Sequence, residues 1–213
     1  MDPESVPVFH ITHVRNLPSI IAADEILSDA ARIASGLAIE SIGMATIKTR
    51  RLALPVHCHA GTCVGEYVPF NFCPRSVMLF VIYCRNNPGL TYTDGQDPIV
   101  HLEFNLGSLM RWAETKGRPW AFTLGNAGAN YAEFRSTRTA LDEINWTAVN
   151  SDDFRAASAK EAKQAEFLLH QGVPWSQVRR IGVAKMSTHA KVVAAIGDAI
   201  VKPPVQILPD WYF

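Results

Sequence analysis

The chain has 213 residues, 48% of them hydrophobic, and its 20 Lys and Arg residues balance its 20 Asp and Glu residues. This length suffices for one substantial core and is short for two, so we expect a single domain over residues 1–213. Because these charges balance, the protein cannot attract a polyanion through its net charge. Any nucleic-acid binding must therefore use local patches.

The N-terminus and the cysteines indicate the compartment. Residues 1–7 lack a basic segment followed by an apolar run, and no apolar stretch approaches the roughly 18 residues of a membrane span. The four cysteines lie in a chain too large to need disulfide bonds. We expect a cytoplasmic monomer with reduced thiols and no membrane contact.

One cluster contains residue types that bind zinc, namely His57-Cys58-His59 with Cys63. Its spacing matches no paired Cys-x-x-Cys arrangement, and Gly61 is typical of a loop. We therefore expect no metal site.

The first quarter of the chain predicts a strand and a helix, followed by irregular segments. Residues 6–12 favour a strand, and Asn16-Leu17-Pro18 is typical of a helix start, with the helix continuing to about Asp24. Residues 30–47 are apolar but contain glycines, which is compatible with a loose helix or a covering loop. Residues 48–63 resemble a loop.

The middle of the chain predicts several short strands. The two prolines of residues 67–76 exclude a central strand there. The unbroken apolar run at residues 77–84 is typical of a strand covered on both faces. Further strands are expected at residues 99–104 and 120–123, with a short helix at residues 105–114 between them.

The C-terminal part continues this alternation. Residues 164–170 predict a strand with Glu166 and His170 on one face. A turn, a strand, a helix and a last strand follow, at residues 172–175, 178–184, 188–200 and 205–208. The helix is expected to bury Val192, Val193, Ala195, Ile196 and Ile200. Alternating strands and helices with several adjacent short strands predict an α+β, or mixed α/β, domain.

Two segments collect positive charge. Residues 48–63 contain three cations, Lys48, Arg50 and Arg51, and no acidic residue. Residues 111–138 contain five cations against two acidic residues. Each segment suits an anionic ligand, and a solvated basic turn is the alternative for each.

Glu166 stands at the mouth of an apolar strand, so it is either a half-exposed strand-end residue or a retained site residue. Together with His10, Thr12 and Arg51, it suits glycosyl transfer from a positively charged leaving group. A carboxylate stabilises the oxocarbenium character of the sugar, and an arginine binds a pyrophosphate or an anion on the acceptor. One carboxylate suffices, because nicotinamide leaves neutral and needs no proton.

Several motifs occur in an order that is typical of a known family. They are residues 8–13 (VFHITH) with Asn16-Leu17, Arg50-Arg51, residues 67–79 (YVPFNFCPRSVML), Gln164-Ala165-Glu166 and Asp210-Trp211-Tyr212. In this order they resemble the landmarks of the DarT family of DNA ADP-ribosyltransferase toxins, and the resemblance covers nearly the whole chain. It implies an ADP-ribosyltransferase fold, in which a split β-sheet with flanking helices forms an NAD cleft.

The resemblance also implies an activity. ADP-ribose would pass from NAD, the substrate, to a base in single-stranded DNA, and an antitoxin protein that removes this modification would control the toxin. Glu166 would be the catalytic carboxylate, and Arg51 would assist activation of the base. The candidates for the NAD cleft are His10, Thr12, Asn16, Tyr67 and Arg75.

Two positions depart from the thymine-directed members that the chain resembles. Asn71 replaces a tyrosine, and Asn126 follows the Phe-Thr strand end where those members have Asp-x-His. In the family these positions lie near NAD or the target base, as does Met78, for which a core methionine is the alternative. An asparagine offers both a donor and an acceptor, which suits the hydrogen-bonding groups of guanine, so we favour guanine over thymine.

The basic segments would follow the phosphates of an unstacked single strand. The candidates are Lys48, Arg50, Arg118, Arg135 and Arg138. Stacking surfaces could come from Trp120, Tyr131 or Trp146, unless these rings pack in the core.

Two other functions remain open. The same fold could modify tRNA or protein, or use water as the acceptor, which would make it an NAD glycohydrolase. The chain could also be a nucleic-acid-binding module without turnover. Binding of NAD separates the module from the enzymes, because a ligand stabilises the protein that binds it.

Overall fold

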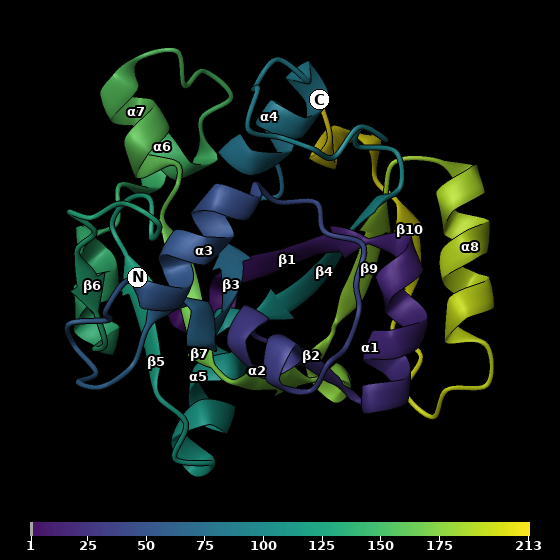
Figure 1. Cartoon of the computed structure of the whole chain (residues 1–213), viewed down its shortest axis with the longest axis horizontal. Coiled ribbons are helices and arrows are strands. Elements are labelled where there is room, and N and C mark those ends of the chain that lie inside the picture. The colour runs from purple at the N-terminus through teal and green to yellow at the C-terminus, as the bar shows by residue number, and fades with distance from the viewer. Residues whose placement is uncertain (1) are drawn as a thin grey trace.

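The computed structural model describes residues 2–213 and confirms the α+β class. Its strands are β1 Pro7–His13, β2 Glu25–Leu27, β3 Tyr67–Asn71, β4 Ile99–Asn105, β5 Trp120–Thr123, β6 Phe134–Arg135, β7 Glu166–His170, β8 Gly172–Pro174, β9 Arg180–Val183 and β10 Val205–Ile207 (Figure 1). Within these residues the main sheet has the order β10-β9-β4-β1-β3-β7-β5-β6. β10 and β9 are parallel, the other neighbours are antiparallel, and β2 pairs with β8 separately.

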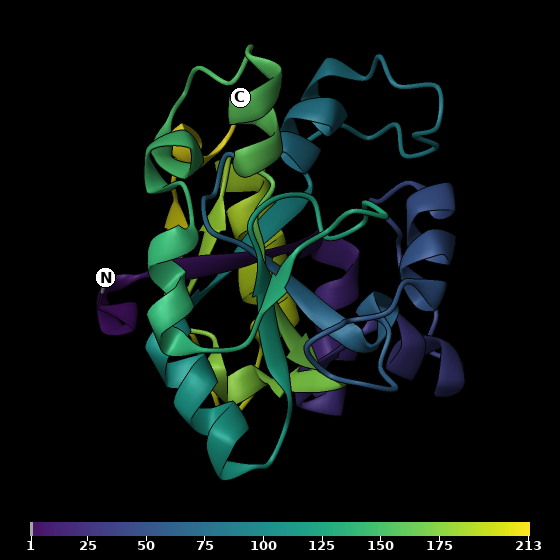
Figure 2. The same ribbon diagram turned by 90° about the vertical axis from the view of Figure 1, so that its left-hand side faces the viewer.

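Helices cover both sides of the main sheet. They are α1 Leu17–Ala23, α2 Asp29–Ala34, α3 Ala45–Ala53, α4 Val77–Cys84, α5 Leu106–Thr115, α6 Trp146–Asn150, α7 Ala157–Ala162 and α8 Met186–Ile196. Short 3-10 helices lie at Pro3–Ser5, Val14–Asn16, Val64–Glu66, Arg138–Glu143, Trp175–Gln177 and Pro209–Trp211. Figure 2 shows α3 on one side of the central strands and α5 on the other.

The sheet splits between β1 and β3. β1 pairs with β4 at seven register positions but with β3 at one, Phe9 opposite Asn71. Pro69, in the middle of β3, has no N–H to donate, and its carbonyl accepts a hydrogen bond from Nδ1 of His10 at 3.0 Å. The side chain of His10 thus takes the place of the backbone hydrogen bonds that are missing between β1 and β3. The two half-sheets diverge from this point.

The main core holds the two half-sheets together behind the split. Phe70 of β3 is fully buried and packs edge to face on Phe104 of β4, with ring centroids 5.0 Å apart. It also contacts Phe167 of β7 at 5.9 Å. Leu109 and other apolar residues of α5 close the same cluster. This packing fixes β7, and with it the position of Glu166, relative to β1.

Most of the predicted elements are confirmed. The predicted strands at residues 6–12, 99–104, 120–123, 164–170, 178–184 and 205–208, and the helices at 17–24 and 105–114, correspond to β1, β4, β5, β7, β9, β10, α1 and α5. Residues 30–47, whose class the sequence left open, contain most of α2, a loop and the start of α3.

Three predictions of local structure are wrong. β3 is a central strand despite Pro69, because the proline lies where pairing with β1 is lost. Residues 77–84 form a helix, α4, whose first turn is capped by the side chain of Ser76. Residues 48–53 belong to α3 and are not a loop.

Two further predictions near the C-terminus are also wrong. Residues 172–174 form β8, which pairs with β2, and are not a simple turn. The last helix ends at Ile196 because Gly197 adopts a positive φ of 45°. Ile200 lies beyond this end of the helix and is 100% exposed. Val193, within α8, is 49% exposed, so its predicted burial is also wrong.

Three further observations concern features that the sequence raised. Within residues 2–213 no helix is both long and apolar enough to cross a bilayer. The four cysteines are free thiols. No three His, Cys, Asp or Glu residues of this range are placed to share a metal ion.

The buried His101 predicts how stability depends on pH. It lies among the rings of Phe9, Trp211 and Tyr212, and its Nε2 donates to the carbonyl of Pro74 at 2.9 Å. Its Nδ1 is buried without a partner within residues 2–213. Burial lowers the pKa of His101 from 6.5 to about 4, although the Pro74 hydrogen bond opposes this.

The folded state therefore prefers neutral His101, and the contribution of this preference to the free energy of unfolding is fully present above pH 6.5. This contribution is lost as the pH falls from 6.5 towards 4, and it amounts to about 3 kcal/mol. We expect the free energy of unfolding, measured with urea from pH 7 to 4.5, to fall less steeply for His101→Gln than for the original chain. Equal slopes would contradict this account.

Candidate functional site

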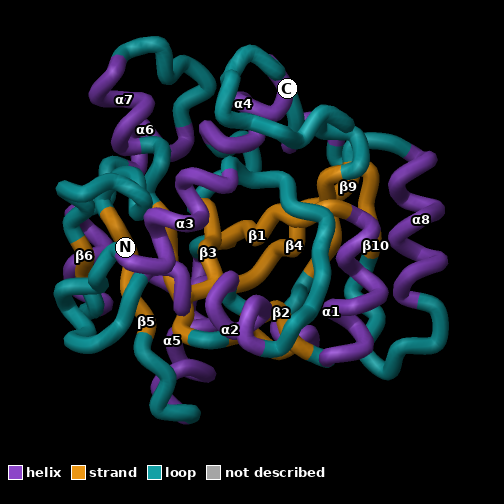
Figure 3. The backbone as a smooth tube through the Cα atoms, viewed as in Figure 1, coloured by secondary structure: helices purple, strands orange, loops and turns teal. Residues whose placement is uncertain are grey.

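A cavity of about 270 Å³ opens where β1 and β3 diverge. Its floor comes from β1, β3 and β7. Residues 37–44, the loop between α2 and α3, form its front wall, and Figure 3 shows this loop crossing in front of β1 and β4. Most of the lining is apolar, and the polar side chains gather towards β1, β7, α2 and α3.

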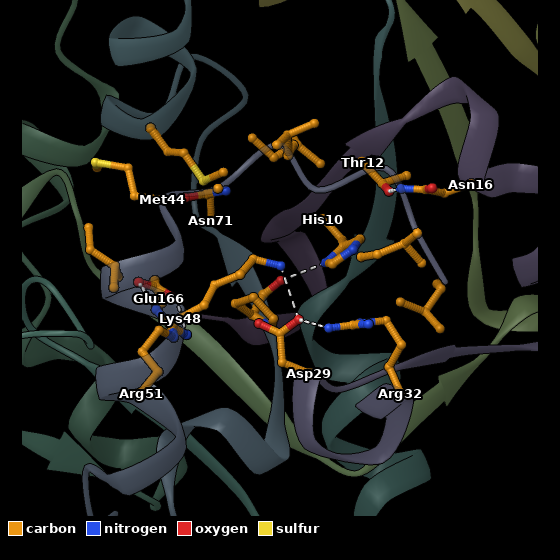
Figure 4. Close-up of a pocket in the computed structure, with 18 of the residues that line it drawn as sticks. His10, Thr12, Asn16, Asp29, Arg32, Met44, Lys48, Arg51, Asn71 and Glu166 are labelled. Atoms are coloured by element: carbon orange, nitrogen blue, oxygen red, sulfur yellow. Dashed lines mark hydrogen bonds and ion pairs between the residues drawn. The ribbon is translucent and has the colours of Figure 1, made fainter. Parts of the chain in front are cut away.

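The cavity brings together Arg51 of α3 and Glu166 of β7, which are 115 positions apart in the sequence (Figure 4). Nη1 of Arg51 lies 3.0 Å from Oε1 of Glu166, and Nη2 lies 2.9 Å from Oε2. The side chains are only 13% and 14% exposed. Burial opposes the charge of Arg51, but the charge and hydrogen bonds of Glu166 outweigh it and raise the pKa of Arg51. This is a bidentate, charge-assisted pair.

The two asparagines named in the sequence lie in the same cavity. Asn71 stands directly opposite Glu166 in the register of β3 and β7. Its amide forms no hydrogen bond within residues 2–213, so it is free to contact a ligand. Asn126 enters from the loop after β5. Its side-chain oxygen accepts from the N–H of Gly128 at 2.8 Å, which leaves the amide N–H₂ unused in this turn.

His10, Thr12 and Asn16 also line the cavity. Burial lowers the pKa of His10, and the hydrogen bond to Pro69 offsets this only in part, so the imidazole is neutral at pH 7. Nδ2 of Asn16 donates to Oγ1 of Thr12 at 3.0 Å and to the carbonyl of Glu40 at 2.9 Å. Asn16 therefore ties the front wall to the floor, and its side chain does not cap α1.

A second charged group lies on the α2 side of the cavity. Nζ of Lys48 is 3.0 Å from Oδ1 of Asp29, and Nη2 of Arg32 is 3.6 Å from the same oxygen (Figure 4). Nε of Arg32 is buried without a partner within residues 2–213. Two cations that share one carboxylate suit an anionic ligand such as a phosphate. Sequence reasoning missed Asp29 and Arg32; their one signal was the Ser28-Asp29 helix start.

Two residues proposed for the NAD cleft do not line the cavity. Tyr67 lies farther along β3 in a separate apolar cluster, where its hydroxyl is 3.0 Å from that of Thr62. Arg75 pairs with Asp152 at 2.8 Å and lies over the ring of Phe213.

The candidate phosphate-binding residues are dispersed. Lys48 lies in the cavity, and Arg50 is exposed beside it on α3. The others are paired with acidic residues: Arg118 with Glu25, Arg135 with Glu133 and Glu143, and Arg138 with Glu114. The excess charge of residues 111–138 is thus compensated across the fold.

The stacking candidates divide between the core and the surface. Trp120 is buried, and Trp146 packs on Phe72 and donates to the carbonyl of Leu141, so both are core residues. Tyr131 is 73% exposed. Met78 lines the cavity from α4, and the alternative of a core methionine in a strand is therefore wrong.

Comparisons with known proteins agree with this geometry. The family model described as "ssDNA thymidine ADP-ribosyltransferase, DarT" matches residues 9–213. A DNA ADP-ribosyl transferase of Thermus sp. (strain 2.9) is 32% identical over an alignment of 214 positions, which covers 99% of this chain and 98% of that protein.

Two solved structures share the fold. Thermus sp. 2.9 DarT in complex with ADP-ribosylated ssDNA superposes with a TM-score of 0.89 at 31% identity, covering 99% of this chain and 98% of the other. The same protein in complex with NAD+ gives a TM-score of 0.82 at 29% identity and covers 100% of both chains. A protein with the overall fold of this chain has thus been solved with each of these two ligands.

The Arg51–Glu166 pair predicts energetic coupling. Because both side chains are largely buried, removing either leaves the other charge without its partner. In a double-mutant cycle of Arg51→Met and Glu166→Gln, measured by urea unfolding, we expect a coupling energy of about 1–3 kcal/mol. The matched control is the exposed pair Arg155–Asp153, for which we expect no measurable coupling. Equal coupling in the two cycles would show that the cavity pair does not act as a unit.

Proposed function

Because this chain belongs to the DarT family, we propose that it transfers ADP-ribose from NAD to a base of single-stranded DNA. The observation that carries this proposal is the Arg51–Glu166 pair at the split of the sheet. It supplies one carboxylate to stabilise a cationic sugar and one guanidinium beside it. NAD is consumed as a substrate, and no metal is needed.

The cavity suggests how NAD is held. His10 and Thr12 line the cavity, and we propose that they contact the nicotinamide riboside half. Lys48 and Arg32 would contact the pyrophosphate, whose charge would take the place of Asp29. When the bond between ribose and nicotinamide breaks, Glu166 stabilises the positive charge that develops on the sugar. Nicotinamide leaves as a neutral molecule.

The acceptor base then attacks the opposite face of the ribose carbon. In the resting state both oxygens of Glu166 accept hydrogen bonds from Arg51, and we expect the sugar of NAD to compete with Arg51 for this carboxylate. The freed guanidinium can stabilise negative charge on the base as its proton leaves. A base in a single strand reaches this position without the energetic cost of opening a duplex.

Asn71, Asn126 and Met78 line the cavity, and we propose that they contact the base. The two amides suit guanine, which presents more hydrogen-bonding groups than thymine. The description of the matching family model names thymidine. We propose that Asn71 and Asn126 decide between these two bases, and oligonucleotides of defined composition test this.

The biological setting follows from family membership. We propose that the protein acts as a toxin in the cytoplasm, as a monomer, and that an antitoxin protein removes the modification. Formal charges balance over the chain, so its net charge gives no long-range attraction to DNA.

The role proposed for Glu166 defines the decisive experiment. The protein is incubated with NAD and single-stranded oligonucleotides in which guanine or thymine is the variable base, and the digested nucleosides are analysed by mass spectrometry. We expect one added ADP-ribosyl group on one of the two, and a rate at least about 100-fold lower for Glu166→Gln. Release of ADP-ribose at equal rates with and without DNA would support a glycohydrolase instead. No adduct on either base would end the proposal.

Lys48 predicts a defect in NAD binding. Lys48→Met removes a cation from the cavity, and we expect the dissociation constant of NAD, measured by calorimetry, to rise about tenfold. Arg50→Met is the matched control, because Arg50 is exposed on the same helix and lies outside the cavity lining. Equal effects of the two substitutions would show that the helix contributes only a general positive charge.

A further inference from the structure

The hydroxyl of Thr123 joins the strand that carries Glu166 to a neighbouring loop. Thr123 ends β5 and is fully buried. Its Oγ1 accepts a hydrogen bond from the backbone N–H of Glu166 at 3.1 Å and donates to the carbonyl of Gly125 at 2.7 Å. A single hydroxyl therefore sets the start of β7 and the first turn of the loop at residues 124–128.

A second link joins the same loop to α7. The carboxylate of Glu161 accepts a hydrogen bond from the backbone N–H of Asn126 at 3.1 Å. It also packs tightly on Gly125, where an added Cβ would lie 2.7 Å from Oε1 of Glu161. Glu161 thus fixes the backbone from which Asn126 enters the cavity.

Neither Thr123 nor Glu161 lines the cavity, but each holds a residue that does. Thr123 fixes the backbone of Glu166, which the sugar needs whatever the acceptor is. Glu161 fixes the backbone of Asn126, which is needed only if a base is the acceptor. The two links therefore act on different parts of the reaction, since a small displacement of a positioned group is costly to the rate.

We propose that Thr123 and Glu161 are positioning residues with separable effects. Thr123 supports both NAD hydrolysis and transfer to DNA, whereas Glu161 supports transfer to DNA alone. In both reactions the bond between ribose and nicotinamide breaks and nicotinamide leaves neutral. In hydrolysis the oxygen of water forms the new bond and a proton is released. In transfer the base forms it and loses its proton. This inference rests on the proposed function.

The test measures two quantities: the rate of nicotinamide release, with and without DNA, and the number of DNA adducts formed per nicotinamide released when DNA is present. We expect Thr123→Val to lower the release rate about 10- to 100-fold with or without DNA. Because the same hydroxyl also holds the carbonyl of Gly125, the number of adducts per nicotinamide should fall as well. Thr123→Ser, which keeps the hydroxyl, restores the rate. We expect Glu161→Ala to lower the number of adducts per nicotinamide about tenfold while the release rate measured without DNA stays unchanged. Glu161→Gln, which keeps an acceptor oxygen, restores transfer.

Ser158→Ala, on the exposed surface of α7, is the matched control and should change neither quantity. Unfolding temperatures of all variants, with and without NAD, separate positioning from loss of the fold. If Glu161→Ala lowers release and transfer in equal proportion, or if Thr123→Ser fails to restore the rate in a folded protein, the inference is wrong. If the original chain forms no adduct at all, the proposed function fails first, and that result is distinct from a failure of the variants.

Discussion

The functional geometry depends on the loss of strand pairing between β1 and β3. Seven register positions join β1 to β4 and one joins it to β3, so the sheet is continuous in order but open at this point. Pro69 makes the opening possible because it has no N–H, and His10 satisfies its carbonyl from the other strand. Aromatic packing of Phe70, Phe104 and Phe167 behind the split stabilises the two half-sheets. Polar side chains can therefore line the gap without destabilising the core.

The charges of the cavity are compensated within the protein. Arg51 pairs with Glu166 and Lys48 with Asp29, so binding of an anionic nucleotide exchanges partners and does not meet free charges. Each charge avoids the cost of being left unpaired in a partly buried site. The exchange also has a chemical consequence. On the proposed function, a ligand that competes for one member of the Arg51–Glu166 pair makes the other member more available for the reaction.

The sequence predicted the strands well and the cavity only in part. Alternating or bounded apolar runs located β1, β4, β5 and β7, whereas the uniformly apolar residues 77–84 fit a strand or a helix equally, and only the Ser76 cap distinguishes them. Arg51 and Glu166 were assigned through the family motifs, because no local pattern relates residues 115 positions apart. Asp29, Arg32, Thr123 and Glu161 could not be assigned at all. Their roles arise from tertiary contacts that short segments of sequence do not encode.

An enzyme that exposes a reactive sugar must prevent water from taking the place of the intended acceptor. Glu166, the carboxylate proposed to activate the sugar, stands on a strand, where pairing and packing hold it firmly. Asn126, which we propose to contact the acceptor, stands on a loop, which is intrinsically the less ordered kind of support. The hydroxyl of Thr123 and the carboxylate of Glu161 join this loop to the strand and to the helix before it. Three hydrogen bonds from two side chains thereby hold a loop residue against the sheet and α7, and on the proposed function they bias the choice between water and a base.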